Sequence, residues 1–286
     1  MDGFLLIDKP KGITSQTVCN IVKKKLNINK CGHNGTLDPN TTGIMLIAIN
    51  QATKCLKLLN EHDKEYIATI IFGLDSNTLD MDTKEEIRSI DMDVNIDDIK
   101  DALNKLKEEE YQLPPLTSAI KIDGKKLYEY QRNNIDIDIK PRHVKLYDYE
   151  IISPLRDFNG HKEIDVRVKV SKGYYVRALA RDLGKMLGGC AILHELRRTK
   201  MDDYDVKDAI KLDDICEKNV VGITDFLKYP SVEVLDYMRR LVQNGIELDS
   251  RQTNLKGVFY VTNNCDIIAL YEEISENKYK PILIFK

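Results

Sequence analysis

One carboxylate stands out as a candidate for chemistry: Asp38, in the stretch Gly-His-Asn-Gly-Thr-Leu-Asp-Pro at residues 32–39. Gly35 before it and Pro39 after it suit a rigid, exposed turn that presents a single acid. An ionised Asp can act as a nucleophile or stabilise a developing positive charge. An Asp before a Pro is also ordinary turn chemistry, and taken alone the residue favours that interpretation. The case for Asp38 therefore depends on the rest of the chain.

Other reactive side chains form no recognisable site. The six cysteines include no CxxC pair and the five histidines no HExxH motif, so the sequence predicts neither a zinc site nor a disulfide framework. No glycine-rich phosphate loop occurs, and we expect no metal or nucleotide cofactor. No apolar run approaches the ~20 residues that cross a membrane, and the N-terminus lacks the features of a signal peptide. We therefore expect a cytoplasmic protein that does not bind membranes.

Charge is segregated along the chain although the net charge is only -3. Residues 1–57 carry a net charge of +5 and residues 140–200 a net charge of +7, whereas residues 58–139 carry -10 and residues 201–286 carry -5. Two basic segments could fold into one positive face that attracts a phosphate backbone. Chance clustering of solvated charge would produce the same counts, and the counts alone favour that simpler explanation.

Hydrophobic patterns predict the elements that must position Asp38. Apolar residues at helical spacing are typical of helices, whereas alternating or continuous apolar runs are typical of strands. Ser15 is a candidate cap for a helix whose apolar residues are Val18, Ile21, Val22 and Leu26. We expect strands at 4–7, 44–49, 65–73 and 164–170, and further helices at 96–107 and 176–187. Tyr175 and Arg177 then lie where a strand passes into a helix, so their side chains can point into a cleft.

The pattern changes near residue 230 to short predicted strands separated by turns, at 258–261, 267–271 and 281–285. We therefore divide the chain into a domain at 1–229 and a small β-rich domain at 230–286. Strands and helices do not alternate regularly, which favours an α+β fold over a doubly wound one.

Five segments, in order along residues 3–200, resemble motifs of the TruB family of tRNA pseudouridine synthases. Residues 32–39 with Thr42 and Gly43 are similar to GHTGTLDPLATG, although Asn34 replaces a Thr and residues 40–42 are more polar. A sixth segment, residues 73–82, matches GxxTxTxDxxG only in part, keeping Thr78 and Asp80 but losing the last Gly. The other similar segments are residues 5–15 (LLxDKPxGxTS), 118–121 with 124–130 (SALKxxGKKLYEYAR), 171–177 (SKGTYIR) and 196–199 (LRRT).

The resemblance implies a fold and three catalytic residues. The fold would be α+β, with a mixed, mainly antiparallel sheet in the catalytic domain (1–229) and a short PUA-like RNA-binding domain (230–286). Asp38 would be the catalytic aspartate, Tyr66 the tyrosine that stacks on the uracil, and Arg177 the arginine that pairs with the aspartate and keeps it ionised. Without the resemblance, Tyr66 would be interpreted as a core aromatic and Arg177 as a surface residue that the helix dipole disfavours.

The resemblance also implies RNA-binding residues. His33 would enter the RNA loop and fill the stack that the flipped base leaves, Tyr175 and Leu196 would line the base pocket, and Lys9 would lie near the active site. Arg197 and Arg198 are candidates for phosphate contacts. Outside this family, an ordinary loop role would be the better interpretation of His33, core packing would be a strong alternative for Leu196, and a turn role would be equally plausible for Lys9.

The implied activity is isomerisation of uridine to pseudouridine at position 55 in the T-arm of tRNA, by base flipping and an aspartate-dependent cleavage and re-formation of the glycosidic bond. We expect the substrate to be the tRNA T stem-loop, and the protein to be a monomer without an obligate protein partner. One alternative is a chaperone-like module that helps tRNA fold without catalysis. A glycosidase-type hydrolase would need a second acid, for which Asp80 and Glu65 are the candidates, and a fourth possibility is a synthase directed by a guide RNA and partner proteins.

Overall fold

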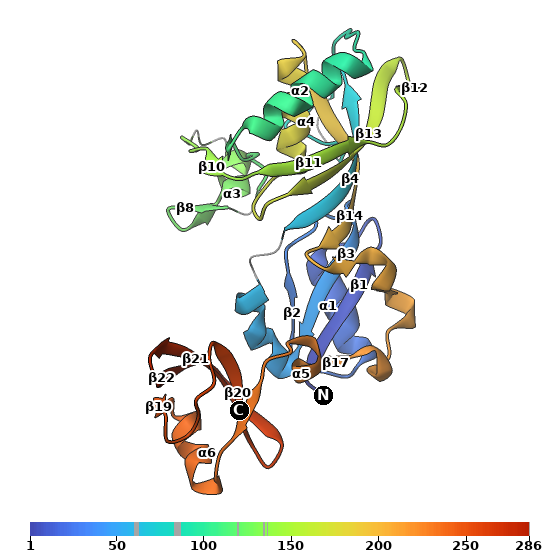
Figure 1. Ribbon diagram of the computed structural model, residues 1–286. Coiled ribbons are helices and arrows are strands. Elements are labelled where there is room, and N and C mark those ends of the chain that lie inside the picture. Colours follow the sequence, from blue (N-terminus) through green and yellow to red (C-terminus); the bar gives the residue numbers. More distant parts are fainter. Residues whose placement is uncertain (60–62, 83–86, 119, 134, 136, 286) are drawn as a thin grey trace.

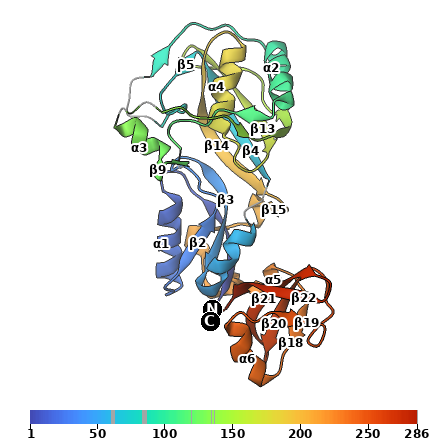
Figure 2. The same cartoon turned by 90° about the vertical axis from the view of Figure 1, so that its left-hand side faces the viewer.

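The protein is elongated, with a large sheet running through its upper and middle parts and a smaller sheet at one end (Figure 1). This computed structural model describes residues 1–59, 63–82, 87–118, 120–133, 135 and 137–285. The N-terminus and the C-terminal end of the chain lie close together, near the junction of the two sheets (Figure 2). In the part of the chain that the structure describes, no helix is long and apolar enough to span a membrane.

The large sheet has a mixed, mainly antiparallel order, which confirms the predicted fold class. Its order is β11 (Leu146–Ile151), β13 (His161–Val170), β4 (Lys64–Phe72), β14 (Ala191–Met201), β3 (Thr42–Ile49), β1 (Gly3–Lys9) and β16 (Ile210–Lys211). Within this order β14 pairs with β3 and β1 with β16 in parallel, and the other neighbours are antiparallel. Four short strands pair at its margins: β2 (Cys31–Asn34), β12 (Arg156–Phe158), β15 (Tyr204–Asp205) and β17 (Val221–Gly222).

Strand β3 is buried on both faces, as its continuous apolar run predicts. Every residue from Ile44 to Ile49 has an exposed fraction of 0%. Because successive side chains of a strand point to opposite faces, Met45 and Ile47 enter the main core while Ile44 and Leu46 enter a second apolar cluster. The strand that follows the Asp38 loop is therefore fixed from both sides.

The predicted helices appear as α1 (Ser15–Lys25), α2 (Ile96–Glu108) and α4 (Val176–Met186). The cap of α1 is Thr14 and not Ser15: the Thr14 hydroxyl accepts a hydrogen bond from the Thr17 amide. Ser15 instead lies in the first turn, where its hydroxyl bonds the backbone of Leu37. Helices α2 and α4 lie side by side on one face of the upper sheet (Figure 1).

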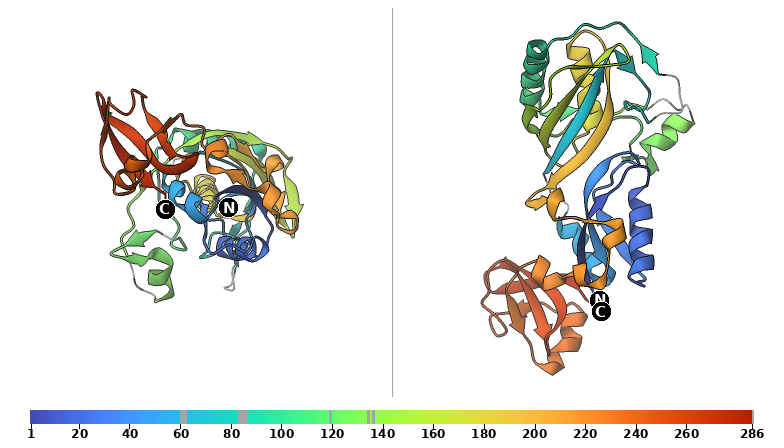
Figure 3. Two further views of the ribbon diagram at one scale, coloured as in Figure 1. Left: turned by 90° about the horizontal axis from the view of Figure 1, so that it is seen from below. Right: turned by 90° about the vertical axis from the view of Figure 1, so that its right-hand side faces the viewer.

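The second sheet has the order β18 (Ser231–Glu233), β20 (Val258–Asn263), β21 (Asp266–Ser275), β22 (Lys278–Ile284) and β19 (Leu248–Asp249), with helix α6 (Asp236–Gln243) packed on it. It meets the large sheet through one apolar cluster that contains Phe4 and Ile44 from one side and Tyr260 and Phe285 from the other. The right-hand view of Figure 3 shows this unit at the end of the molecule nearest the N-terminus.

Some elements escaped the sequence analysis, among them α6, the long strand β14 and the 3-10 helix η1 (Asn50–Leu59). The remaining short elements are β5 (Leu74–Asp75), β6 (Arg88–Ser89), β7 (Tyr111–Gln112), β8 (Lys121–Ile122), β9 (Lys125–Lys126), α3 (Leu127–Arg132), β10 (Arg142–His143), η2 (Val206–Asp208), η3 (Leu212–Asp214), η4 (Glu217–Asn219) and α5 (Ile223–Phe226).

Candidate active site

The loop that carries Asp38 is fastened at three points to the start of the chain. The Ser15 hydroxyl donates to the Leu37 carbonyl (3.0 Å) and accepts from the Leu37 amide (2.9 Å). On the other side of Asp38, the Pro39 carbonyl accepts from the Lys9 ammonium (2.7 Å) and from the Gly12 amide (2.9 Å). Asp38 is therefore held between two anchored neighbours, while its own side chain remains 47% exposed.

Lys9 is the most deeply buried of these anchors, with an exposed fraction of 0%. Its ammonium donates to the carbonyls of Pro10 (2.9 Å) and Pro39 (2.7 Å). Burial lowers the pKa of Lys9 to about 8, although the negative charge of Asp38 acts in the opposite direction. The structure thus places Lys9 behind the Asp38 loop, where it supports the loop from inside.

Arg177 lies in the first turn of α4 and meets Asp38. One guanidinium nitrogen lies 3.2 Å from the Asp38 carboxylate and another lies 3.5 Å from the carboxylate of Asp80. The helix dipole opposes a cation at this end, but the two carboxylates offset that cost. The guanidinium also donates to the Thr78 carbonyl (3.0 Å) and to the hydroxyl (2.7 Å) and carbonyl (3.1 Å) of Thr117.

Asp80, which the sequence offered only as part of an incomplete motif and as a candidate second acid of a hydrolase, is a second acid beside Arg177. Its side chain is only 16% exposed, and burial raises its pKa, while a hydrogen bond from Thr78 and the charge of Arg177 lower it. The Thr78 hydroxyl donates to the Asp80 carboxylate over 2.7 Å. The sequence signal for this bond was the position of Thr78 two residues before Asp80, because a hydroxyl side chain in a turn commonly bonds to a polar group nearby in the sequence.

A cavity of about 150 Å³ opens beside Asp38. Leu196 and Asp80 both line it. The remaining lining residues are Lys11, Asn40, Thr41, Met81, Asp82, Leu193 and His194. Among the described residues, no three His, Cys, Asp or Glu side chains are grouped so that they could hold a metal ion.

The two predicted tyrosines lie on strand β4 and immediately before helix α4. Tyr66 is on β4, where it pairs in register with Val168 and Arg198, and it is 8% exposed. Tyr175 immediately precedes α4, and its backbone is held by Gln112, which accepts from the Tyr175 amide (2.9 Å) and donates to its carbonyl (3.2 Å). Burial raises the pKa of the Tyr175 hydroxyl, so it remains a proton donor at neutral pH.

His33, predicted to enter the RNA loop, lies on β2 and is partly buried. Its Nδ1 atom is buried and has no hydrogen-bond partner in the described ranges. Burial lowers its pKa, and the charge of Arg198 lowers it further. A neutral ring with an unsatisfied nitrogen is suited to leave its place when a better partner arrives.

The prediction that Arg198 contacts phosphate is wrong. The residue is 1% exposed, and its guanidinium donates to the carbonyls of Ile44 (2.8 Å) and Gly35 (3.2 Å). Arg198 therefore braces the loop before Asp38 from within. Arg197 is more accessible, but its guanidinium makes a two-pronged bond with Asp8 (3.0 and 2.7 Å), so a phosphate would have to compete with that carboxylate.

Comparison with known families identifies this arrangement. Residues 23–176 match the model of the TruB family pseudouridylate synthase (N terminal domain), and residues 177–243 match that of the tRNA pseudouridylate synthase B C-terminal domain. The chain belongs to the TruB family of pseudouridine synthases. The first TruB model ends at Val176, so the two models divide the chain between Val176 and Arg177, at the start of α4.

Relatives within the TruB family match this chain along its whole length. The protein named tRNA pseudouridine synthase B of Onion yellows phytoplasma (strain OY-M) is 36% identical over 290 residues, covering 100% of both chains. That of Aquifex aeolicus (strain VF5) is 41% identical over 280 residues, covering 95% of this chain and 96% of the relative. A chain in the crystal structure of a Cbf5-Nop10-Gar1 complex is 25% identical with a TM-score of 0.67, covering 99% of this chain and 84% of that one.

Proposed function

We propose that this protein converts uridine to pseudouridine at position 55 in the T-arm of tRNA. The observation that carries the proposal is the contact of Asp38 with Arg177 at 3.2 Å beside a cavity, in a chain whose full-length relatives are named tRNA pseudouridine synthase B. Isomerisation of uridine needs an acidic group at the junction of sugar and base, and it needs no redox group. The site supplies such a group.

In the proposed reaction the Asp38 carboxylate acts on the flipped nucleoside, either as a nucleophile or by stabilising positive charge on the sugar. The N1–C1′ bond breaks, the base turns, and a C5–C1′ bond forms. The proton that leaves C5 balances the proton that N1 gains, so no co-reactant is consumed. Arg177 keeps the carboxylate ionised and oriented before the RNA arrives.

The other proposed roles follow from position. Tyr66 stacks on the flipped uracil, and Tyr175 offers its protonated hydroxyl to the base. Leu196 forms an apolar wall, since it lines the same cavity as Asp38. His33 occupies the stack that the base leaves, for which it is suited because its buried Nδ1 has no hydrogen-bond partner among the described residues.

We further propose that residues 1–229 form the catalytic domain and residues 230–286 contribute to RNA binding. The second sheet begins at Ser231 and is joined to the first by an apolar cluster, so it presents a surface in a defined orientation. Chain-wide charge segregation, with net charges of +5 at residues 1–57 and +7 at residues 140–200, supports phosphate contacts mainly on the catalytic domain.

An unmodified tRNA transcript tests the activity. Purified protein should form pseudouridine in the T loop at position 55, and the Asp38→Asn variant should form none while still binding the transcript. Product at another position, or full activity in the variant, would overturn the assignment. A variant that retained every biological effect of the protein without making pseudouridine would instead favour the tRNA-folding alternative.

We propose that the chain acts alone as a monomer. The solved relative in complex with Nop10 and Gar1 shares the fold over 99% of this chain, so the requirement for partners has to be tested directly. Turnover of naked tRNA by the lone chain, with rates proportional to protein concentration, is the expected result. Activity that appeared only after adding cell extract or a guide RNA would contradict it.

A further inference from the structure

His194 lines the same cavity as Asp38, yet neither the motifs nor the proposed reaction gives it a role. It lies on β14 between Leu193, which pairs with Ile70, and Glu195, which pairs with Thr69, so His194 is the extra residue of a β-bulge. A bulge redirects a side chain out of the regular alternation of a strand. The same bulge holds the Asp80 loop through two backbone hydrogen bonds of 3.0 Å. The Leu193 amide donates to the Leu79 carbonyl, and the Leu193 carbonyl accepts from the Met81 amide.

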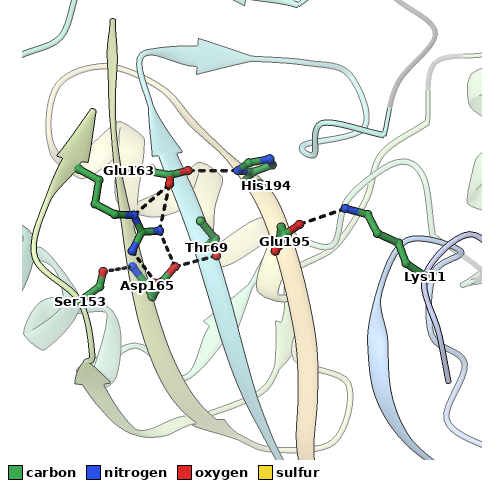
Figure 4. A network of polar contacts seen from close by, with 8 residues as sticks. Lys11, Thr69, Ser153, Glu163, Asp165, His194 and Glu195 are labelled. Carbon is green, nitrogen blue, oxygen red and sulfur yellow. Dashed lines mark hydrogen bonds and ion pairs between the residues drawn. The ribbon is translucent and has the colours of Figure 1, made fainter. Parts of the chain in front are cut away.

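A polar network fixes the His194 ring from behind. Nδ1 of His194 lies 3.1 Å from the carboxylate of Glu163, which reaches across β4 from β13 (Figure 4). Arg156 donates to Glu163 (3.0 Å) and to Asp165 (2.6 and 3.0 Å), and Thr69 donates to Asp165 (2.7 Å). Each carboxylate is thus tied to a neighbour on another strand, so the ring cannot turn without breaking the network.

This anchoring decides which nitrogen faces a ligand. An ionised carboxylate can only accept hydrogen bonds, so the Glu163 contact places a proton on Nδ1 of His194. In a neutral imidazole Nε2 is then the acceptor. Nε2 has no hydrogen-bond partner among the described residues, and in Figure 4 the ring extends away from Glu163. Nε2 is thus left for a group in the cavity.

The other cavity groups indicate what that ligand is. Asp38, Asp80 and Asp82 supply carboxylates, while the ammonium of Lys11 at the rim is already paired with Glu195 at 3.1 Å (Figure 4). Such a wall repels a phosphate, because like charges disfavour each other at close range. It suits a neutral group with an O–H donor, and in RNA the ribose 2′-hydroxyl is that group.

We propose that the cavity receives a ribose 2′-hydroxyl of the RNA beside Asp38 and that His194 is the specificity-determining residue that accepts its hydrogen bond. The inference rests on the proposed function, because it takes the substrate to be RNA whose target nucleoside meets Asp38. His194 then discriminates RNA from DNA at one nucleotide. Its contribution is to binding and selection, and the bond-breaking steps remain with Asp38.

The test combines changes in the protein with changes in the RNA. T-arm stem-loops carrying a single 2′-deoxy substitution at the target nucleotide, or at the nucleotide on either side, are compared with the all-ribose stem-loop. Values of kcat and KM for pseudouridine formation are measured for wild type and for His194→Asn, which keeps a group near Nδ1 for Glu163 but removes the one at Nε2. One neutral hydrogen bond corresponds to about a 2- to 10-fold loss in kcat/KM.

At one of the three positions, the deoxy substitution should lower the kcat/KM of wild type by this factor. The kcat/KM of His194→Asn should be the same on that RNA as on the all-ribose stem-loop. The other two positions should affect both proteins equally. His194→Gln, whose amide reaches toward the Nε2 position, should recover part of the discrimination. Equal deoxy losses in wild type and His194→Asn at all three positions would overturn the inference while leaving the proposed function intact. A wild-type protein that forms no pseudouridine on the all-ribose RNA would overturn the proposed function itself.

Discussion

At the scale of single residues, the site is organised around one shared cation. Arg177 contacts both Asp38 (3.2 Å) and Asp80 (3.5 Å), and these carboxylates differ in accessibility, with side chains 47% and 16% exposed. The exposed carboxylate is free to meet substrate, whereas the buried one is committed to orienting the guanidinium. This division of labour assigns chemistry to Asp38 and positioning to Asp80.

Asp80→Asn should therefore impair turnover more than binding. Loss of the buried charge lets Arg177 shift relative to Asp38, and a displacement of about 1 Å at a reacting group can cost roughly 100-fold in rate. We expect kcat on a tRNA transcript to fall by about that factor with little change in KM. Asp75→Asn is the control, because Asp75 pairs with the exposed Arg88. An unchanged kcat in Asp80→Asn would remove Asp80 from the mechanism.

Lys9 gives the stability of the protein a specific pH dependence. Its pKa is about 8 in the folded chain, because burial lowers it from the ordinary value of 10.5. Between these pH values the unfolded chain binds more protons than the folded chain, so the contribution of Lys9 to the free energy of unfolding rises with pH.

Denaturant unfolding of wild type and Lys9→Met between pH 7 and pH 10 tests this. The wild type should gain on the order of 2 kcal/mol relative to the variant across this range. Lys64, whose pKa burial also lowers to about 8, is present in both proteins, so its titration cancels from the difference. Parallel pH profiles would show that Lys9 does not titrate as the structure indicates.

At the scale of elements, the junction of β3 and β14 joins the loop to the rest of the site. The two strands meet in parallel at only two register positions, Thr42 with Arg197 and Gly43 with Arg198. Gly43 has φ of +110°, and a Cβ atom there would lie 2.1 Å from the Arg198 carbonyl oxygen. The close approach lets Arg198 reach back to Gly35 and Ile44.

Gly43→Ala should be severely destabilising, because backbone atoms on both strands would have to move apart. We expect a loss of at least about 4 kcal/mol in the free energy of unfolding, the range of the most disruptive single substitutions. Gly12→Ala is the matched control: its φ of +88° is also positive, but a Cβ there meets nothing within 4 Å. The control should lose about 1–2 kcal/mol. Similar losses for both variants would show that the strand contact is loose.

The same junction shows why part of the site was predictable from sequence and part was not. Uniform hydrophobic patterns, such as the apolar run of β3 and the helical spacing of α4, reflect directly which side chains are buried. Both elements were predicted from these patterns. Strand β14 changes from apolar residues to charged ones after Leu193, because its second half borders the site, and this break hides the strand. Helix α6 was hidden because Tyr237 and Leu241, 69% and 42% exposed, do not follow its buried face.

The site residues could be identified from sequence by their type and by the motifs around them. The atoms that they contact could be identified only from the folded structure. Asp38 and Arg177 stand in distinctive motifs, so their pairing could be expected. Arg198 also stands in a motif, but only the sheet shows that it is buried against backbone carbonyls. Asp80 and His194 become site residues through the β14 bulge, and nothing in their immediate sequence announces that bulge.

At the scale of the whole molecule, the second sheet packs against the first unit through specific contacts and is not joined to it by the chain connection alone. The Tyr260 hydroxyl donates to the Leu227 carbonyl (2.8 Å), and Lys54 and Lys57 of η1 donate to the carbonyls of Ile284 (2.8 Å) and Ile282 (2.9 Å). With the shared apolar cluster, these bonds give the second sheet a fixed orientation relative to the Asp38 loop. An RNA that contacts both units would then meet a preformed surface and lose little binding energy to ordering the protein.

Phe285→Ala should loosen this docking. Phe285 is 5% exposed within the shared cluster, and truncating a buried Phe costs about 3–5 kcal/mol. Because the cluster joins the two sheets, we expect amide hydrogen exchange to accelerate in β20, β21 and β22 but to remain slow in β4 and β13. Ile274→Ala is the control on the same sheet, since that side chain is 46% exposed, and it should leave exchange unchanged throughout. If exchange accelerated equally in β4 and β13, the two sheets would unfold as one cooperative unit; if it accelerated nowhere, the cluster would contribute nothing to docking.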